Sequence, residues 1–151
     1  MEVEIKKLSE ADIADFSELI GIFEVVFEMK NFKMPADAHL QNLLSKPDFF
    51  TLVAKYHNRV IGGLTVYILH RYYSEKPVAY IYDVGVSTDY QRKGVGKKLM
   101  NYLTHYCEEN GFEDAFVEAE TDDIQAVNFY RRTSFSSELQ ATQFTYSFEQ
   151  E

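Results

Sequence analysis

The chain has 151 residues, of which 46% are hydrophobic and 26% are charged, values typical of one folded globular domain. Fifteen lysine and arginine residues against 24 aspartate and glutamate residues give a net charge of −9. This balance argues against a general nucleic-acid-binding protein, because such proteins neutralise phosphates with clustered cations. A cationic partner suits an acidic chain better. We therefore expect residues 1–151 to form a single domain that binds no nucleic acid.

The cysteine count and the hydrophobic pattern indicate a cytoplasmic protein. Cys107 is the only cysteine, so no intrachain disulfide and no thiolate metal cluster can form. Residues 1–7 alternate charged and apolar side chains and lack the apolar run of a signal peptide. No window approaches about 18 continuous apolar residues, so we expect no membrane-spanning segment.

The first half of the chain predicts a strand, two helices and a β-hairpin. Residues 3–8 alternate imperfectly, as a short strand does. Apolar side chains at spacings of three and four predict a helix over residues 10–27 with one buried stripe, and a second, shorter helix follows over 36–44. β-Branched and aromatic residues over 49–56 and 60–69 predict a hairpin.

The second half alternates strands and helices. The predicted elements are a strand over 79–86, a helix over 94–110 that ends before Gly111, a strand over 115–120, a helix over 124–132 and one or two closing strands over 138–148. A right-handed crossover makes the two middle strands parallel. The predicted fold is mixed α/β, with a central, mostly antiparallel sheet, a parallel middle pair and helices on both faces. In such sheets ligands collect at the carboxyl ends of the parallel strands.

The segment from Gln91 to Lys97 is the most informative stretch of the sequence. Gly94 and Gly96 stand where a helix begins, so backbone N–H groups can turn toward an anion, and the helix dipole adds to the attraction. Neither a P-loop nor a dinucleotide fingerprint matches the spacing. The alternative is a tight turn without a ligand. Four cations surround the same turn and favour a phosphate site: Arg92, Lys93, Lys97 and Lys98.

Two motifs carry a resemblance to a known family. The pattern Gln91-x-x-Gly94-x-Gly96, after a strand and at a helix start, resembles the acetyl-CoA pyrophosphate motif of the GNAT acetyltransferases. Residues 126–130 resemble the second conserved block of that superfamily, and the element order is similar along the whole chain. Within the superfamily, residues 80–87 are similar to the small, gentamicin-modifying aminoglycoside 3-N-acetyltransferases, as is the spacing from Asp122 to Tyr130.

The resemblance implies a GNAT fold whose parallel strands splay apart for acetyl-CoA. It also implies direct transfer of the acetyl group to an amine, with no covalent enzyme intermediate, and a homodimer. Tyr130 corresponds to the family's tyrosine near the departing sulfur, which donates a proton to it. Val84 and Val86 would offer backbone groups to the thioester and the pantetheine arm, with Gly85 permitting a bulge. The residues expected at the cofactor are Val84, Gly85, Val86, Gln91, Arg92, Lys93, Gly94, Val95, Gly96 and Lys97.

Asp83 is the candidate for acceptor chemistry. Strand alternation predicts that it shares a face with Ile81 and Gly85 in a central strand. A buried, unpaired carboxylate costs several kcal/mol, so it should face a ligand cavity or a cation. It would then bind the substrate ammonium or act as a base through water. The alternative is a carboxylate satisfied by backbone or tyrosine donors.

Further carboxylates predict an acidic mouth for a polycation. Glu118 and Glu120 alternate along the predicted strand 115–120 and would share one face, while Asp122 and Asp123 follow at its carboxyl end. Clustered carboxylates at a strand terminus would hold and steer an aminoglycoside. For at least one of the two aspartates, capping the next helix is the more ordinary role.

Other nucleophile and metal chemistry has little support in the sequence. Cys107 lies next to the apolar stripe of its predicted helix, without a nearby base, and reads as a small core residue. The four histidines form no ligand spacing, so we expect no metal site; they are His39, His57, His70 and His105.

Together these features predict an acetyl-CoA-dependent N-acetyltransferase that acts on an amine of a cationic small molecule. The favoured acceptor is the 3-amino group of an aminoglycoside, which would make the protein an antibiotic-resistance enzyme. A polyamine or a protein amine would also suit an acidic groove, and a non-catalytic CoA-binding domain is the third possibility. Retention of Asp83 and Tyr130 favours the enzyme. The apolar residues 144–148 would pair across the dimer.

Overall fold

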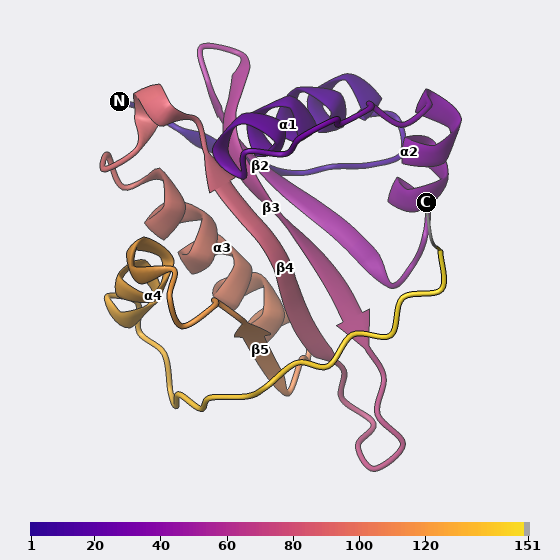
Figure 1. Ribbon diagram of the computed structural model, residues 1–151, viewed down its shortest axis with the longest axis vertical. Coiled ribbons are helices and arrows are strands. Elements are labelled where there is room, and N and C mark those ends of the chain that lie inside the picture. Colours follow the sequence, from indigo (N-terminus) through magenta and orange to yellow (C-terminus); the bar gives the residue numbers. More distant parts are fainter. Residues whose placement is uncertain (150–151) are drawn as a thin grey trace. The chain divides into compact units, whose positions relative to one another are not determined.

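The computed structural model describes residues 1–149 (Figure 1). The chain groups into two compact units, Met1–Glu118 and Ala119–Glu151. Among the described residues, the first unit holds every strand and the second holds helix α4. The elements are β1 Glu4–Lys7, α1 Ile13–Val26, α2 Asp37–Leu44, β2 Phe49–Tyr56, β3 Arg59–Leu69, β4 Val78–Val86, the 3-10 turn η1 Thr88–Tyr90, α3 Val95–Glu109, β5 Asp114–Val117 and α4 Ile124–Arg131.

The strands of the described residues form one sheet in the order β1-β2-β3-β4-β5. Neighbours from β1 to β4 are antiparallel, whereas β4 and β5 are parallel and are joined through α3. A parallel pair needs such a crossover, because a tight turn can only reverse the chain. The predicted mixed sheet is therefore confirmed. Its parallel pair lies at one edge of the sheet rather than in the middle, since the described residues after β5 contain no further strand.

Helices cover both faces of the sheet. Successive side chains of a strand point to opposite faces. Phe49 of β2 lies 6.2 Å from Phe16 of α1, while the next residue, Phe50, lies 5.1 Å from Tyr106 of α3, measured between ring centroids. Helix α1 therefore covers one face and α3 the other, as Figure 1 shows and as the sequence predicts.

The apolar stripes of the long helices form the core. Helix α1 buries Phe16, Leu19 and Phe23, at the spacings of three and four that predicted it. Helix α3 buries Leu103 and Cys107, one turn apart. Burial raises the pKa of the Cys107 thiol to about 11, so it is neutral at pH 7 and packs as a small apolar group. No helix among residues 1–149 is long and apolar enough to cross a membrane.

Two strand predictions at the end of the chain are wrong. Strand β5 ends at Val117, so Glu118 and Glu120 do not alternate along one strand. Residues 138–149 form neither helix nor strand, although strands were predicted over 138–148. Their alternating apolar residues match a strand pattern, but a strand also needs a neighbour for its backbone hydrogen bonds, and alternation does not supply one. The large side chains of this segment are exposed: Leu139, Phe144, Tyr146 and Phe148.

Candidate active site

Strand β4 carries a β-bulge beside Asp83. Asp83 is opposite Thr65 on β3, but the next residue of β3 is opposite Ile81, so Tyr82 has no partner in the register. The backbone N–H of Asp83 donates to Thr65 Oγ1 at 3.2 Å. A bulge adds one residue to one strand and redirects the side chains around it. The alternation of β4 therefore changes phase at Tyr82.

The bulge corrects the predicted face of Asp83. A Cβ on Gly85 would lie 2.9 Å from the Phe23 ring of α1, so Gly85 faces that helix, and Asp83, two residues away, shares its face. Ile81 precedes the bulge and points to the opposite face, where it is 2% exposed. The prediction that Asp83 and Ile81 share a face is wrong. Gly85 is needed for close packing against α1, and the bulge lies at Tyr82 instead.

Four aromatic rings form a continuous row on the face of Asp83. The rings of Tyr67 of β3 and Tyr82 pack edge-on with 5.4 Å between their centroids, and those of Tyr82 and Tyr80 pack edge-on with 5.7 Å between theirs. Tyr80 then stacks on Phe116 of β5 at 4.6 Å with the ring planes 8° apart. We call these four residues the aromatic row. Sequence analysis missed it, because strict alternation does not place Tyr82 and Asp83 on one face.

Asp83 is a half-buried carboxylate beside this row. Burial raises the pKa of Asp83, because the ionised carboxylate loses solvation. Burial also raises the pKa of Tyr67, and the nearby Tyr82 and Asp83 raise it further. Among the described residues, no lysine or arginine forms an ion pair with Asp83. A bound cation would offset the cost of this charge.

Glu118 is held next to the aromatic row by Tyr80. The Tyr80 hydroxyl donates to Glu118 Oε1 at 2.7 Å. This hydrogen bond, with burial and the Glu118 charge, raises the pKa of Tyr80 to about 12, so Tyr80 remains a donor at neutral pH. Two carboxylates, Asp83 and Glu118, thus accompany the row within one unit of the structure.

Strands β4 and β5 pair over only part of β4. The parallel register runs from Val78 opposite Asp114 to Ile81 opposite Val117 and stops there. Residues 84–86 remain paired with β3 on one side and have no β5 partner on the other. This open edge is where the resemblance predicts the pantetheine arm at Val84, Gly85 and Val86. Unpaired strand edges offer N–H and C=O groups to an extended ligand.

The turn between β4 and α3 has the backbone of an anion cradle. Gln91 Nε2 donates to the carbonyl oxygen of Val86 at 2.9 Å, which ties the turn to the strand end. Arg92 and Gly94 have φ of 62° and 83°, in the left-handed region, and α3 begins directly afterwards at Val95. The first N–H groups of the helix therefore point out of its start. The turn therefore has the local backbone that the sequence motif predicts, and its binding of a pyrophosphate stays a prediction.

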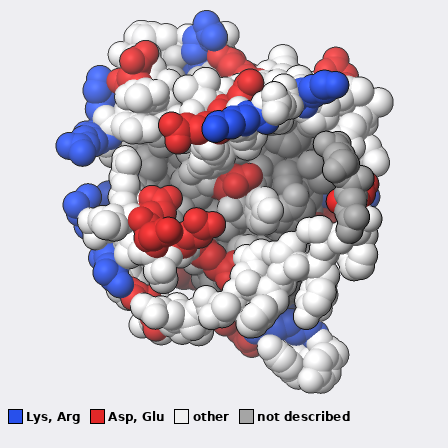
Figure 2. All heavy atoms as spheres, viewed as in Figure 1, with Lys and Arg blue, Asp and Glu red and all other residues white. Residues whose placement is uncertain are grey.

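The cations of this turn are exposed at the surface. Arg92, Lys93, Lys97 and Lys98 are all solvent-exposed, and Lys93 Nζ lies 5.6 Å from the Tyr90 ring centroid. The wider surface is mixed in charge: Figure 2 shows lysine and arginine side chains interspersed with acidic ones on the visible face. The basic character is therefore local to the turn.

The second unit carries the remaining predicted residues. Asp123 accepts a hydrogen bond from the N–H of Ala126 at 3.2 Å and so caps α4, which confirms the more ordinary role for one of the two aspartates. Asp122 and Glu120 are exposed. Tyr130 lies on α4, where its ring meets Phe129 edge-on at 5.0 Å. The roles predicted for Glu120, Asp122 and Tyr130 stay predictions.

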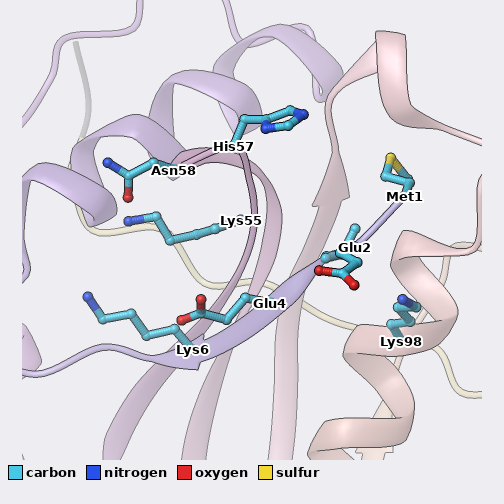
Figure 3. A pocket seen from close by; sticks show the side chains of 9 residues that line it. Met1, Glu2, Glu4, Lys6, Lys55, His57, Asn58 and Lys98 are labelled. Atoms are coloured by element: carbon cyan, nitrogen blue, oxygen red, sulfur yellow. The ribbon is translucent and has the colours of Figure 1, made fainter.

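A groove of about 660 Å³ lies between β1, the turn after β2 and α3 (Figure 3). Two of its lysines form ion pairs: Lys6 Nζ lies 3.0 Å from Asp12 Oδ1, and Lys55 Nζ lies 3.2 Å from Asp15 Oδ2. Lys98, one of the four cations near the Gly94 turn, lines the groove, which contains none of the residues predicted to contact the cofactor or the acceptor. We interpret these ion pairs as contacts that fix α1 to the sheet.

The described residues contain no group of three histidine, cysteine, aspartate or glutamate side chains placed to hold a metal ion. The parts of the candidate site are a carboxylate on an aromatic face, an open strand edge and a glycine turn at a helix start.

Residues 14–135 match the family model described as the acetyltransferase (GNAT) family. The chain belongs to this family. The match contains β4, the turn at Gly94, helix α3 and Tyr130, so the residues that carried the resemblance lie within it. The GNAT fold predicted from the sequence is confirmed.

Structural relatives narrow the comparison. The aminoglycoside acetyltransferase meta-AAC0020 from an uncultured soil metagenomic sample, solved in complex with trehalose, is 47% identical over 97% of each chain, with a TM-score of 0.95. Its complex with sisomicin is 46% identical, with the same coverage and TM-score. The aminoglycoside acetyltransferase HMB0005, also from an uncultured soil metagenomic sample, is 26% identical over 97% of this chain and 100% of its own, with a TM-score of 0.87.

Similarity to curated proteins covers shorter segments. N-alpha-acetyltransferase 50 of Danio rerio is 24% identical over 84 residues, which span 55% of this chain and 49% of that protein. The chain thus matches about half the length of this curated relative.

Proposed function

We propose that the protein transfers the acetyl group of acetyl-CoA to the 3-amino group of an aminoglycoside. The observation that carries the proposal is Asp83, a half-buried carboxylate beside the aromatic row, without a basic partner among the described residues. An ammonium group of the acceptor would supply the missing charge. The relative meta-AAC0020, which is 46% identical in its complex with sisomicin, supports an acceptor of this class.

Acetyl-CoA would bind through backbone groups. Its pyrophosphate would lie on the N–H groups at the start of α3, beside Gly94, and its pantetheine arm along the open edge of β4 at residues 84–86. The support is the left-handed turn, the Gln91 hydrogen bond to Val86 and the register that ends at Ile81.

The reaction needs one proton acceptor and one proton donor. The acceptor ammonium must lose a proton before its nitrogen forms a bond to the acetyl carbon, and the sulfur gains a proton as the C–S bond breaks. Asp83 would take the first proton, directly or through water, helped by a pKa that burial raises. Tyr130 would supply the second, a role that rests on the family resemblance.

The other carboxylates would attract the polycation. Glu118 stands beside the aromatic row through its hydrogen bond with Tyr80. Glu120 and Asp122 are exposed in the second unit and would add long-range attraction, while Asp123 also caps α4. Attraction of this kind weakens with salt over a screening length of about 8 Å at physiological ionic strength.

A panel of acceptors tests the proposal. The protein is incubated with acetyl-CoA and sisomicin, spermidine or a peptide with a free N-terminus, and thiol release is followed. We expect turnover with sisomicin to exceed the others, and NMR of the product to locate the acetyl group on the 3-amino nitrogen. Acetylation at another nitrogen would reject the regiochemistry alone. Turnover of spermidine or the peptide alone would reject the aminoglycoside as the acceptor. If no acceptor led to thiol release, the non-catalytic CoA-binding domain would be the remaining interpretation.

We also propose that the enzyme is a cytoplasmic homodimer. The exposed apolar side chains at Phe144, Tyr146 and Phe148 offer surface for a second copy, and the single cysteine suits a reducing compartment. Light scattering after size-exclusion chromatography measures the mass in solution. A monomer at micromolar concentration would reject the dimer.

A further inference from the structure

Tyr82 is an exposed residue of β4 whose ring contacts two other aromatic rings. It is the extra residue of the β4 bulge, and 56% of its surface is exposed. Its ring is nevertheless held on two sides, edge-on to Tyr67 at 5.4 Å and to Tyr80 at 5.7 Å. Bulges commonly redirect a side chain next to an active site. The result is an open aromatic ring with a fixed position beside Asp83.

The two neighbouring residues offer two different kinds of contact. The face of an aromatic ring is apolar and carries partial negative charge, so it attracts C–H groups and cations. The carboxylate of Asp83 attracts an ammonium group. An acceptor that fits both must present a flat C–H surface and, at its edge, a charged nitrogen. Amino sugars and aminocyclitols have this form, whereas a linear polyamine has the charge without the flat surface.

We propose that Tyr82 is the specificity-determining residue for ring-shaped amines, stacking on the flat face of an aminocyclitol or amino sugar whose ammonium group lies at Asp83. This inference rests on the proposed function and refines it, because it explains how the site would reject linear amines. The hydroxyl of Tyr82 is not required for stacking. Ring size and position are what the geometry uses.

Tyr72 offers a matched control. It is fully exposed, lies outside the aromatic row and meets Tyr73 edge-on at 5.2 Å. Its replacement removes an exposed tyrosine of the same kind without touching the bulge. Tyr82→Phe is the second control, since it keeps the ring and removes only the hydroxyl.

The test measures binding as well as turnover. 2-Deoxystreptamine and 1,3-diaminopropane both carry amines in a 1,3 relation, but only the first has a ring. Each is titrated by NMR into the CoA complex of the wild type and of Tyr82→Leu, Tyr82→Phe and Tyr72→Leu, after thermal melts confirm that all are folded. A proton above an aromatic face shifts upfield, so the ligand C–H signals report stacking directly.

We expect Tyr82→Leu to weaken the binding of 2-deoxystreptamine roughly tenfold, about 1.4 kcal/mol, and to abolish the upfield shifts of its C–H signals. The affinity for the linear diamine should change less than about twofold. Tyr82→Phe and Tyr72→Leu should behave as the wild type. The proposed stacking on Tyr82 would be overturned if Tyr82→Leu weakened the binding of both ligands equally, or if the upfield shifts of 2-deoxystreptamine were unchanged in this variant.

The binding data separate this inference from the proposed function. If 2-deoxystreptamine stacks on Tyr82 but no aminoglycoside is acetylated, the stacking role of Tyr82 stands and the proposed activity is rejected. If Tyr82→Leu acetylates sisomicin as efficiently as the wild type does, the proposed activity stands and the stacking role of Tyr82 is rejected. Failure of the folded wild type to bind any ring-shaped amine would overturn both.

Discussion

The two halves of the candidate site are built from different materials. The turn at the start of α3 offers backbone: two residues with left-handed φ, a helix N-terminus and exposed cations that only surround it. The face around the β4 bulge offers side chains: a half-buried carboxylate and a row of aromatic rings. Backbone recognition suits a ligand part that never changes, such as a pyrophosphate. Side-chain recognition suits an acceptor that differs between relatives.

The largest expected effect comes from the side-chain half. Asp83→Asn keeps the shape of the carboxylate but removes its charge and its basicity. We expect kcat/KM for sisomicin to fall by a hundredfold or more, within the range of about 10²–10⁴ for a lost acid or base, and acceptor KM to rise. Steady-state kinetics checks both. A correctly folded variant with wild-type kinetics would end the catalytic interpretation of Asp83.

Tyr130→Phe should affect kcat and leave binding almost intact. If the hydroxyl protonates the departing sulfur, kcat falls by about a hundredfold while KM for acetyl-CoA changes little. Tyr72→Phe, at a fully exposed position outside the candidate site, is the control and should leave kcat unchanged. An unchanged kcat in Tyr130→Phe would show that water or another group supplies the proton.

The backbone half predicts a smaller and more selective loss. Gly94 and Gly111 have φ of 83° and 75°, and an added Cβ would meet nothing within 4 Å at either position. Alanine at each site therefore introduces the same left-handed strain, about 1–2 kcal/mol. We expect similar losses of thermal stability, but only Gly94→Ala should raise KM for acetyl-CoA, by roughly tenfold. Equal KM values for acetyl-CoA in the two variants would contradict cofactor binding by the backbone at Gly94.

The smallest expected effect is on stability and has the opposite sign to the effect on activity. Burial raises the pKa of Asp83 above its unfolded value of 3.8. The ionised carboxylate therefore lowers the stability of the free enzyme as the pH rises above 3.8. This loss of stability disappears at a pH low enough for Asp83 to be protonated in both the folded and the unfolded state. Asp83→Asn should raise Tm at pH 7 and match the wild type near pH 3. Calorimetry at both pH values checks this, and a lower Tm at pH 7 would assign Asp83 a structural role.

The sequence predicted the backbone half more completely than the side-chain half. Gly94, Gln91 and the helix at Val95 follow one another in the chain, so a local motif contains the whole turn. The aromatic row is assembled from β3, β4 and β5, and its key residue, Tyr82, stands out only once the register with β3 is known. Strict alternation placed Asp83 with Ile81, and a single inserted residue reversed that relation.

The end of the chain shows the same limit. Residues 138–148 have the alternation of a strand, yet the structure gives them none, because pairing depends on a neighbour that the local pattern does not contain. Asp123 shows the converse. Helix capping is a local interaction, and its bond to the N–H of Ala126 agrees with the sequence prediction.

Calorimetric titration of CoA and of sisomicin into Gly94→Ala and Asp83→Asn tests the central division of the site most directly. With each ligand titrated alone, Gly94→Ala should bind CoA roughly tenfold more weakly than Gly111→Ala and sisomicin as the wild type does. Asp83→Asn should bind CoA normally and sisomicin at least about tenfold more weakly. Loss of sisomicin binding in Gly94→Ala, or unchanged sisomicin binding in Asp83→Asn, would contradict a backbone site for the cofactor and a carboxylate site for the acceptor.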